Sequence, residues 1–527
     1  MRVKRWRETT LRYRLMQFIR RREVNVSLAV LAQLLALMLG LVYFGQHYVI
    51  FYFCSTAVGV LCALHVINGR SNPEMKAAWL VPILLVPFFG GVIYILLGRS
   101  RMSRKSRMRM ERNADMLRRA FAREYQQQAQ WLEPYGERVA RESRGIVNMS
   151  GYPVFSGTDT EFLATGEIFW QRLLQELEKA QKYIFLEYYI IQEGEMWQRI
   201  LDVLGRKAAQ GVEVRLMYDD IGCISRLPAD YPSKLRAMGI QVCVFNPYMP
   251  VLTSTANNRD HRKICVIDGN TAFVGGINLA DEYIDRVRYF GYWKDSALVM
   301  RGNAAWGFAV MFLDMWDLIN RGREDWSQFR PDPALTAGVR GQGLVQPMCT
   351  APYSQISLSE STLINIIRNA TKYVYLSTPY LIPTHDLITA MVTAARSGVD
   401  VRVITPNIPD KKIIFAATRA HYMQLIEAGV KVYEYSPGFM HAKQVVSDDR
   451  VAMVGSMNLD FRSMYLNYES MAWLLDVPCI ADIRADMEET MRLSERITQE
   501  KCRALITSGS LPHRLLRSIL RVFSPLM

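Results

Sequence analysis

Two stretches of the chain carry histidine, lysine, aspartate and asparagine at the same spacing. Both fit the pattern H-x-K-x4-D-x6-G-[GS]-x-N without a gap. The residues are His261, Lys263, Asp268 and Asn278 in the first frame and His441, Lys443, Asp448, Ser456 and Asn458 in the second. The chain has only 7 histidines, so two of them in identical frames indicate a shared chemical role rather than chance.

The order of residues in each frame suits a β-strand that delivers a histidine and a lysine together. Side chains alternate along a strand, so His261 and Lys263 point to the same face. An imidazole can act as nucleophile or proton carrier near neutral pH, and an ammonium supplies charge to a phosphate oxygen. Asp268 and Asp448 belong to the frames, but their place at a strand end favours a structural role in a turn. Both asparagines and Ser456 follow a small-residue turn, where they can donate to a phosphate oxygen.

The frames close two copies of a longer repeat, and the repeat predicts the fold class. In each copy, strands rich in β-branched and aromatic residues alternate with helical patterns. These strands cover residues 183–191, 211–217 and 239–247 in the first copy and 373–380, 398–404 and 429–437 in the second. The alternation predicts an α/β fold with two tandem domains, 151–335 and 340–509, each on a mostly parallel or mixed sheet. Two like domains predict a pseudo-dimer with one frame on either side of a shared cleft.

The composition narrows the class of partner. A formal charge of +14 suits nucleic acid, anionic phospholipid or another phosphate-rich substrate. The 8 cysteines include no C-x-x-C pair, so the sequence predicts neither a zinc site nor a disulfide framework. Half of the 527 residues are hydrophobic, which excludes a fully disordered chain.

Three apolar runs predict that residues 1–98 form a membrane-anchoring region with two or three transmembrane or re-entrant helices. They cover residues 26–44, 48–67 and 77–97, each near the ~20 residues that cross a bilayer core. The third run contains Pro82 and Pro87, so a kinked, re-entrant or interfacial segment is an alternative to a full crossing. Nine basic residues precede the first run and ten follow the third, which favours catalytic domains in the cytoplasm.

Two further segments flank the predicted domains. Residues 99–150 form a basic linker, which we expect on the anionic inner leaflet; a solvated linker helix is the alternative. Residues 510–527 have apolar and arginine side chains at helical spacing, which predicts an amphipathic C-terminal helix. That helix is either an interfacial anchor or a docking helix.

The doubled frame resembles the phospholipase D superfamily, over residues from about 150 to 480. Within the superfamily the chain is similar to the membrane-anchored bacterial cardiolipin synthases. The segments that carry this closer resemblance are 72–79, 258–263 (NRDHRK), 378–383 (TPYLIP) and 458–469. The resemblance implies two tandem phospholipase D-like α/β domains in a multi-pass protein of the bacterial inner membrane.

The resemblance also implies a phosphatidyltransferase that works by two successive displacements. It assigns His261 as the nucleophile that forms a phosphohistidine, and His441 as the general acid and base. Asp295 and Glu469 match the position of the carboxylates that orient these imidazoles. Alternatively, Asp295 and Glu469 are ordinary carboxylates at strand ends.

The substrates follow from the same resemblance. Phosphatidylglycerol would be both donor and acceptor, with release of glycerol, in contact with anionic membrane lipid and without a nucleic acid partner. The transferred phosphoryl group would be surrounded by Lys263, Lys443, Asn278 and Asn458. No metal or cofactor is then required, because fixed positive charge acts where a metal acts elsewhere. A homo-oligomer is left open.

Three alternative functions are compatible with some of these residues. A hydrolase, either a phospholipase D or a membrane nuclease, would use the same residues and admit water. A transferase could take another alcohol, such as ethanolamine or serine, as acceptor. A catalytically silent scaffold that binds anionic lipid would have no need of paired imidazoles, so the two intact frames argue against it.

Overall fold

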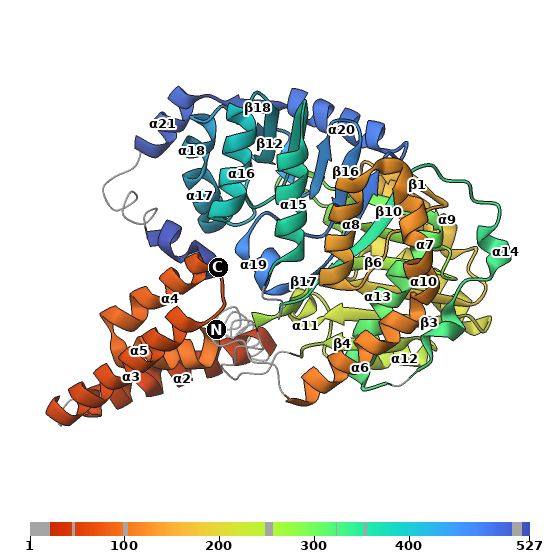
Figure 1. The fold of residues 1–527 in the computed structure, drawn as a ribbon. Coiled ribbons are helices and arrows are strands. Elements are labelled where there is room, and N and C mark those ends of the chain that lie inside the picture. Colours follow the sequence, from red (N-terminus) through yellow and green to blue (C-terminus); the bar gives the residue numbers. More distant parts are fainter. Residues whose placement is uncertain are drawn as a thin grey trace, which may run out of the picture.

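A computed structural model of the protein describes residues 22–44, 48–98, 104–247, 257–322, 324–352, 356–507 and 519–526. The described chain forms an N-terminal helical region, a helical linker and two α/β halves (Figure 1). The C-terminal segment returns to the N-terminal helices. The predicted α/β class with two like halves is confirmed.

The first half is built on a mixed seven-stranded sheet with the order β1-β9-β7-β6-β2-β3-β4. The strands are β1 (Thr158–Leu163), β2 (Tyr183–Tyr188), β3 (Glu213–Asp219), β4 (Gln241–Phe245), β6 (Lys263–Ile267), β7 (Thr271–Gly275) and β9 (Ala297–Gly302). Strands β2, β3 and β4 are parallel, whereas β6 runs antiparallel to β2. One face is covered by α9 (Gly166–Leu177), α10 (Glu195–Ala209) and α12 (Tyr231–Ala237), whose apolar side chains form one core with the sheet.

The second half repeats this order and adds one strand at the edge, β10-β17-β16-β15-β11-β12-β13-β18. The strands are β10 (Leu344–Thr350), β11 (Tyr373–Ser377), β12 (Asp400–Pro406), β13 (Lys431–Tyr435), β15 (Gln444–Ser447), β16 (Val451–Gly455), β17 (Asn467–Leu475) and β18 (Ser494–Ile497). Its outer face is covered by α15 (Leu358–Asn369), α16 (His385–Arg396) and α18 (Tyr422–Ile426). The corresponding order of strands is the structural form of the sequence repeat.

The two halves share a core and exchange short strands. Residues of both sheets, of α13 (Asn303–Asn320) and of α20 (Ile480–Arg492) belong to one buried apolar cluster. The strand β5 (Arg259–Asp260) of the first half pairs in parallel with β17 of the second. Reciprocally, β14 (Gly438–Met440) of the second half pairs in parallel with β8 (Tyr292–Lys294) of the first. This two-way exchange is the pattern of a symmetric dimer interface within one chain.

The N-terminal region consists of α2 (Arg22–Phe44), α3 (Tyr48–Asn68), α4 (Pro73–Leu85), α5 (Pro87–Ile93) and a π-helical turn (Tyr94–Gly98). The third apolar run is broken at Val86, between α4 and α5, and a side chain at Gly90 would lie 2.2 Å from the Pro82 carbonyl oxygen. Among the described residues, one helix is long and apolar enough to cross a membrane, Val49–Asn68. Several crossings therefore stay a prediction.

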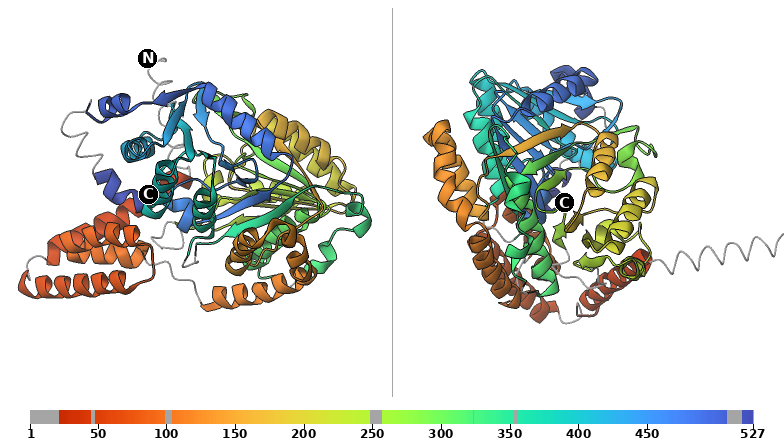
Figure 2. Two further views of the ribbon diagram at one scale, coloured as in Figure 1. Left: turned by 45° about the horizontal axis from the view of Figure 1, so that its top comes forward. Right: turned by 90° about the vertical axis from the view of Figure 1, so that its right-hand side faces the viewer.

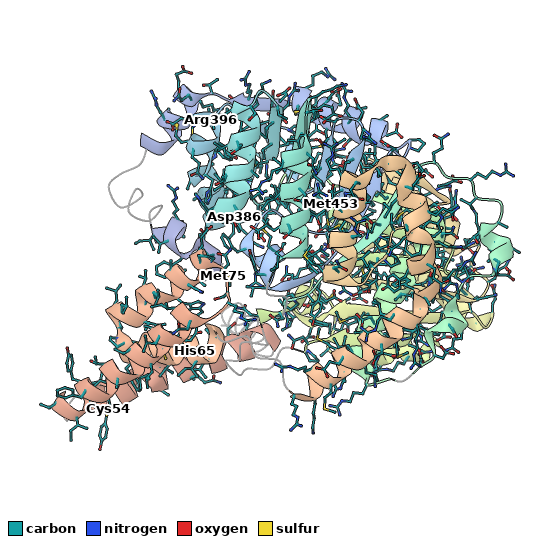
Figure 3. All side chains as sticks on the ribbon, in the orientation of Figure 1. Cys54, His65, Met75, Asp386, Arg396 and Met453 are labelled. Carbon is teal, nitrogen blue, oxygen red and sulfur yellow. The ribbon has the colours of Figure 1, made fainter. Side chains whose placement is uncertain are left out.

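The N-terminal helical region is joined to the second half through the start of α4. The Asn72 side chain donates to the Tyr465 hydroxyl at 3.0 Å, and the Glu74 carboxylate accepts from the backbone N–H of His385 at 2.6 Å. Figure 3 labels Met75 at this joint and Cys54 at the far end of the N-terminal helices, which project from one side of the two α/β halves (Figure 2). The N-terminal helices are therefore fixed to the second half by specific contacts.

The predicted linker also packs on the two α/β halves. It forms α6 (Arg104–Ala120), α7 (Ala122–Leu132) and α8 (Glu137–Ser150). Asn113 donates to the Asp314 carboxylate at 2.8 Å, and the Ser143 hydroxyl donates to Gln346 at 2.9 Å. Contact of this linker with the inner leaflet stays a prediction.

The predicted C-terminal helix, 510–527, lies largely outside the described residues. Residues 519–523 are helical and lead into a 3-10 turn, Ser524–Leu526. This turn packs on α4 and on α19 (Phe461–Tyr465). The described part of the segment thus docks where the N-terminal helical region meets the second half.

Candidate active site

Each histidine directly follows a short strand that pairs with a strand of the opposite half. The backbone N–H of His261 donates to the carbonyl of Tyr468 at 2.9 Å, directly before Glu469. The backbone N–H of His441 donates to the carbonyl of Lys294 at 2.7 Å, directly before Asp295. The exchanged pairings β5/β17 and β14/β8 therefore place each histidine beside a carboxylate of the opposite half.

The side chains complete these crossed pairs. Nδ1 of His261 lies 2.9 Å and 3.1 Å from the two carboxylate oxygens of Glu469. Nδ1 of His441 lies 2.5 Å from Oδ2 of Asp295. A carboxylate on Nδ1 fixes the tautomer with its proton there and leaves Nε2 able to attack or to accept a proton. The sequence indicated both carboxylates, but it gave no sign that each would hold the histidine of the other half.

The two lysines lie beside their own histidines. The ammonium groups of Lys263 and Lys443 donate to the backbone carbonyls of His261 and His441, respectively. Nζ of Lys443 also lies 2.9 Å from Nδ1 of His441. Both lysines are buried, and the charge of Lys443 helps to lower the pKa of Lys263. The structure thus brings both predicted histidine–lysine pairs into one site.

Burial sets the protonation of the site. It lowers the pKa of His261 to about 4, that of Lys263 to about 7 and that of Lys443 to about 8. Burial, together with the charges of the lysines, lowers the pKa of His441 well below its usual range. An anionic phosphodiester in this site would favour the charged forms of these groups and so raise their pKa values.

The two orienting carboxylates differ in charge state. Burial raises the pKa of Asp295 to about 7. Glu469 is equally buried, but the contact with His261 and the charge of Lys263 hold its pKa below the usual range. The His261 pair therefore keeps an ionised carboxylate over a wider range of pH.

A serine in one frame and a glycine in the other explain part of this difference. The hydroxyl of Ser456 donates to Oε2 of Glu469 at 2.5 Å. Gly276 holds the corresponding place in the first frame, where an added side chain would lie 2.2 Å from Oδ1 of Asp295. Ser456, predicted as a phosphate ligand or orienting residue, is placed here to orient the carboxylate that holds His261.

The two asparagines occupy different environments. The side chain of Asn278 accepts from the Ile190 backbone N–H at 3.0 Å and donates to the Tyr283 hydroxyl at 2.7 Å. Its amide is therefore engaged within the first half. Asn458 is buried, and within the described part of the chain its Oδ1 has no hydrogen-bond partner. Of the two, Asn458 retains the capacity to meet a ligand.

The two aspartates of the frames lie at the far ends of their strands from the histidines. The Asp268 carboxylate accepts from the backbone N–H groups of Gln181, Lys182 and Tyr183, each at 2.8 Å. Asp448 accepts in the same way from residues 371–373. In spite of partial burial, these N–H groups hold the pKa of Asp448 below its usual range. Each aspartate therefore ties the end of a frame strand to the start of β2 or β11.

This geometry predicts a loss of stability from Asp268→Ala or Asp448→Ala, with chemistry preserved. Removing the carboxylate leaves three backbone donors unpaired, which we expect to cost about 2–3 kcal/mol and to lower Tm by several degrees. Thermal unfolding in detergent, with kcat measured per folded protein, checks this. A variant that loses kcat while keeping its Tm would instead give the aspartate a role in the reaction.

Aromatic rings line the two histidines unequally. Tyr189 lies with its edge toward His261, with ring centroids 5.0 Å apart. His441 has Tyr283, Trp293 and Phe439 around it at 5.3–5.6 Å. Sequence reasoning missed these three, although Trp293 stands two residues before Asp295. The apolar walls account for the desolvation that shifts the pKa values of the site.

The lysine pKa values predict an alkaline loss of activity. An ammonium is the low-pH form, so a lowered pKa means that its charge is lost at lower pH than usual. We expect kcat/KM, which reports the free enzyme, to fall as pH rises through about 7 to 8, the pKa values of Lys263 and Lys443. The measurement is a pH profile of kcat/KM between pH 6 and 10. A profile that stays flat through pH 9 contradicts this assignment.

No metal site accompanies these residues in the part of the chain that the structure describes. Among those residues, no group of three or more histidine, cysteine, aspartate or glutamate side chains is placed to hold a metal ion. The two buried ammonium groups are the cations of the described site. The arrangement can carry a phosphoryl group on an imidazole and exchange the groups bonded to it.

Comparison with known proteins bears on this site. The family described as "Cardiolipin synthase, PLD-like domain" matches residues 173–290 and 363–491, which contain both frames. A second family, "Phospholipase_D-nuclease N-terminal", matches residues 57–99. A cardiolipin synthase of Alkalihalophilus pseudofirmus is 35% identical over 86% of this chain and 90% of its own length. The chain belongs to the cardiolipin synthase family.

Other relatives agree with this membership. A cardiolipin synthase of Halalkalibacterium halodurans is 32% identical over 90% of this chain and 93% of its own length. An uncharacterized protein of Streptococcus mutans is 36% identical over 88% of this chain. The crystal structure of a phosphatidylserine synthase from Haemophilus influenzae covers 74% of this chain with a TM-score of 0.55 and 16% identity, which shows a shared fold alone. The predicted family and the phospholipase D-like fold are confirmed, and the chain is an enzyme of this family.

Proposed function

We propose that the protein is a cardiolipin synthase that transfers the phosphatidyl group of one phosphatidylglycerol to the terminal hydroxyl of another and releases glycerol. The observation that carries the proposal is the crossed pair of histidines, each held through Nδ1 by a carboxylate of the opposite half. Two such imidazoles beside two buried ammonium groups suit a reaction that needs a nucleophile and a proton carrier at one phosphate.

The first displacement breaks the bond between phosphorus and the glycerol head group. Nε2 of His261 attacks phosphorus, and the phosphatidyl group becomes bonded to this nitrogen. His441, protonated once the phosphodiester is bound, gives its proton to the departing glycerol oxygen. Lys263 and Lys443 offset the negative charge on the nonbridging oxygens.

The second displacement forms the product. The terminal hydroxyl of another phosphatidylglycerol gives its proton to His441 and attacks phosphorus. The bond between phosphorus and His261 then breaks, and the imidazole regains its starting form. One phosphodiester is broken and one is made, so neither water nor a cofactor enters the balance.

Two observations support His261 rather than His441 as the nucleophile. Its partner Glu469 stays ionised, because the pKa of this carboxyl is held below its usual range. Glu469 is also held by Ser456, whereas Gly276 leaves Asp295 without a corresponding hydroxyl. An ionised, firmly oriented carboxylate favours the imidazole that must bear positive charge as a phosphohistidine.

We propose that the protein crosses the inner membrane more than once and keeps its catalytic halves in the cytoplasm. Basic residues on both sides of the apolar runs support this orientation. The helix Val49–Asn68 supports at least one crossing. We also propose that the protein contacts anionic lipid and does not bind nucleic acid.

The products decide between synthesis and its alternatives. The purified full chain is reconstituted in liposomes of labelled phosphatidylglycerol, and the lipids are identified by mass spectrometry. Cardiolipin and free glycerol in equal amounts support the proposal. Phosphatidic acid in place of cardiolipin would show a hydrolase, and a mixed phosphodiester formed only with added serine or ethanolamine would show another acceptor.

A further inference from the structure

A segment at the entrance to α17 (Lys412–Ala420) carries exposed apolar and basic side chains together. Ile408 is 38% exposed and Ile413 is 58% exposed. Lys411 and Lys412 are exposed between them. We call these four residues the α17 edge. Exposed isoleucines on either side of two lysines combine the two attractions that hold a protein on an anionic lipid surface.

The α17 edge lies next to the catalytic residues of the second half. Between its members, Asp410 accepts a hydrogen bond from the Tyr380 hydroxyl at 2.5 Å, and Nζ of Lys411 lies 5.2 Å from the centre of the Tyr380 ring. The charge of Lys411 contributes to the pKa of His441, and that of Asp410 to the pKa of Lys443. The edge is therefore part of the rim of the site and not a distant surface.

Helix α17 also packs against the N-terminal helical region. Ile414 and Ala417 of α17 pack in an apolar cluster with Met75 of α4. The other members of that cluster are Ile382, Phe461 and Tyr465. In Figure 1, α17 and α19 lie on the side of the catalytic body that faces the N-terminal helices. A bilayer that holds those helices therefore lies close to α17, whose N-terminal end carries the α17 edge.

We propose that the α17 edge rests in the surface of an anionic phospholipid bilayer and opens the site directly onto the lipid head groups. This inference deepens the proposed function, on which it rests, because it states how a substrate that stays in the bilayer reaches the histidines. The isoleucines enter the boundary between head groups and acyl chains, and the lysines meet the phosphates.

The first test measures contact and does not depend on activity. A cysteine is introduced by Ile413→Cys in a Cys54→Ser background, labelled with a fluorescent dye and placed with the full chain in phosphatidylglycerol nanodiscs. Lipids with a spin-labelled acyl chain should quench the dye by more than about one third, since an interfacial side chain lies at the upper acyl-chain boundary. The Cys54→Ser parent, labelled in parallel, gives the background from the other cysteines.

The matched control is Ile168→Cys on α9, an isoleucine that is 47% exposed and lies in the first half. It should show no quenching. Equal quenching at both positions, or none at Ile413→Cys, overturns the proposal. A signal at Ile413→Cys that changes with protein concentration but not with spin-labelled lipid would identify a second copy as the occupant and would also overturn it.

The second test separates access from chemistry. Ile413→Glu should lower the ratio of activity on vesicle phosphatidylglycerol to activity on monomeric short-chain phosphatidylglycerol by about tenfold, whereas Ile168→Glu should leave this ratio unchanged. An unchanged ratio for Ile413→Glu overturns the proposal. Failure of the proposed function would give a different result, because wild type would then make no cardiolipin from either substrate. The quenching test would still decide whether the α17 edge contacts lipid.

Discussion

His261→Ala lowers the formation of cardiolipin by at least about 10⁴-fold, the effect expected when the nucleophile of a two-step transfer is removed. Alanine leaves Glu469 without its imidazole and gives phosphorus no nitrogen to bond. The measurement is the initial rate of cardiolipin formation from labelled phosphatidylglycerol in liposomes. Tm should stay within a few degrees of wild type, because this imidazole makes its side-chain contacts at the site and not in the apolar core.

A substrate with a good leaving group distinguishes the two histidines. Phosphatidyl-p-nitrophenol releases a phenolate that needs no proton, so the first displacement no longer depends on the general acid. His441→Ala should then release about one p-nitrophenolate per protein and stop, because no base activates the acceptor. His261→Ala should release none. A burst from His261→Ala and none from His441→Ala would exchange the two roles.

The sequence was sufficient for features that depend on local periodicity. Alternation predicts His261 and Lys263 on one face of a strand. Arg262 between them does point elsewhere, 3.3 Å from the Glu187 carboxylate in the buried interior, but His261 and Arg262 lie between β5 and β6 and not on a strand. The repeat of strands and helices predicted two like sheets in corresponding order. These features follow from the spacing of side chains within a few residues.

Features that depend on contacts between distant segments could not be predicted in the same way. The crossed pairs arise because β5 and β14 leave their own halves to pair with β17 and β8, and nothing in either short strand encodes its partner. Asn278 looked like a phosphate ligand, but its amide is taken by Ile190 and Tyr283. Burial of that amide is a property of the whole half and not of the frame.

The crossed geometry makes each half depend on the other for an orienting carboxylate. A half that is separated from the other keeps its histidine and lysine but loses the carboxylate that orients the imidazole. The first half supplies Asp295 only to His441, and the second supplies Glu469 only to His261. We therefore expect catalysis to require both halves together. Substitution of an orienting carboxylate tests this dependence most directly.

Glu469→Gln should lower kcat by about 10²–10⁴-fold with KM little changed, since replacing an orienting carboxylate by an amide disturbs the tautomer and the charge of its histidine. The charge of Glu469 also raises the pKa of Lys263, so its loss should move the alkaline limb of kcat/KM to lower pH. This second readout separates an orienting role from simple loss of structure. Steady-state kinetics from pH 5 to 9 provide both values.

Asp317→Asn is the matched control, because Asp317 is a buried carboxylate that accepts from the Trp326 indole at 3.0 Å on α13, in contacts that do not include the histidines. It should leave kcat and the alkaline limb unchanged. If Glu469→Gln retained kcat within about threefold, His261 would not depend on the opposite half for its tautomer. If it lost kcat with an unmoved alkaline limb, the coupling between Glu469 and Lys263 would be absent. The expected pair of changes arises only if the carboxylate of one half controls both the imidazole and the ammonium of the other.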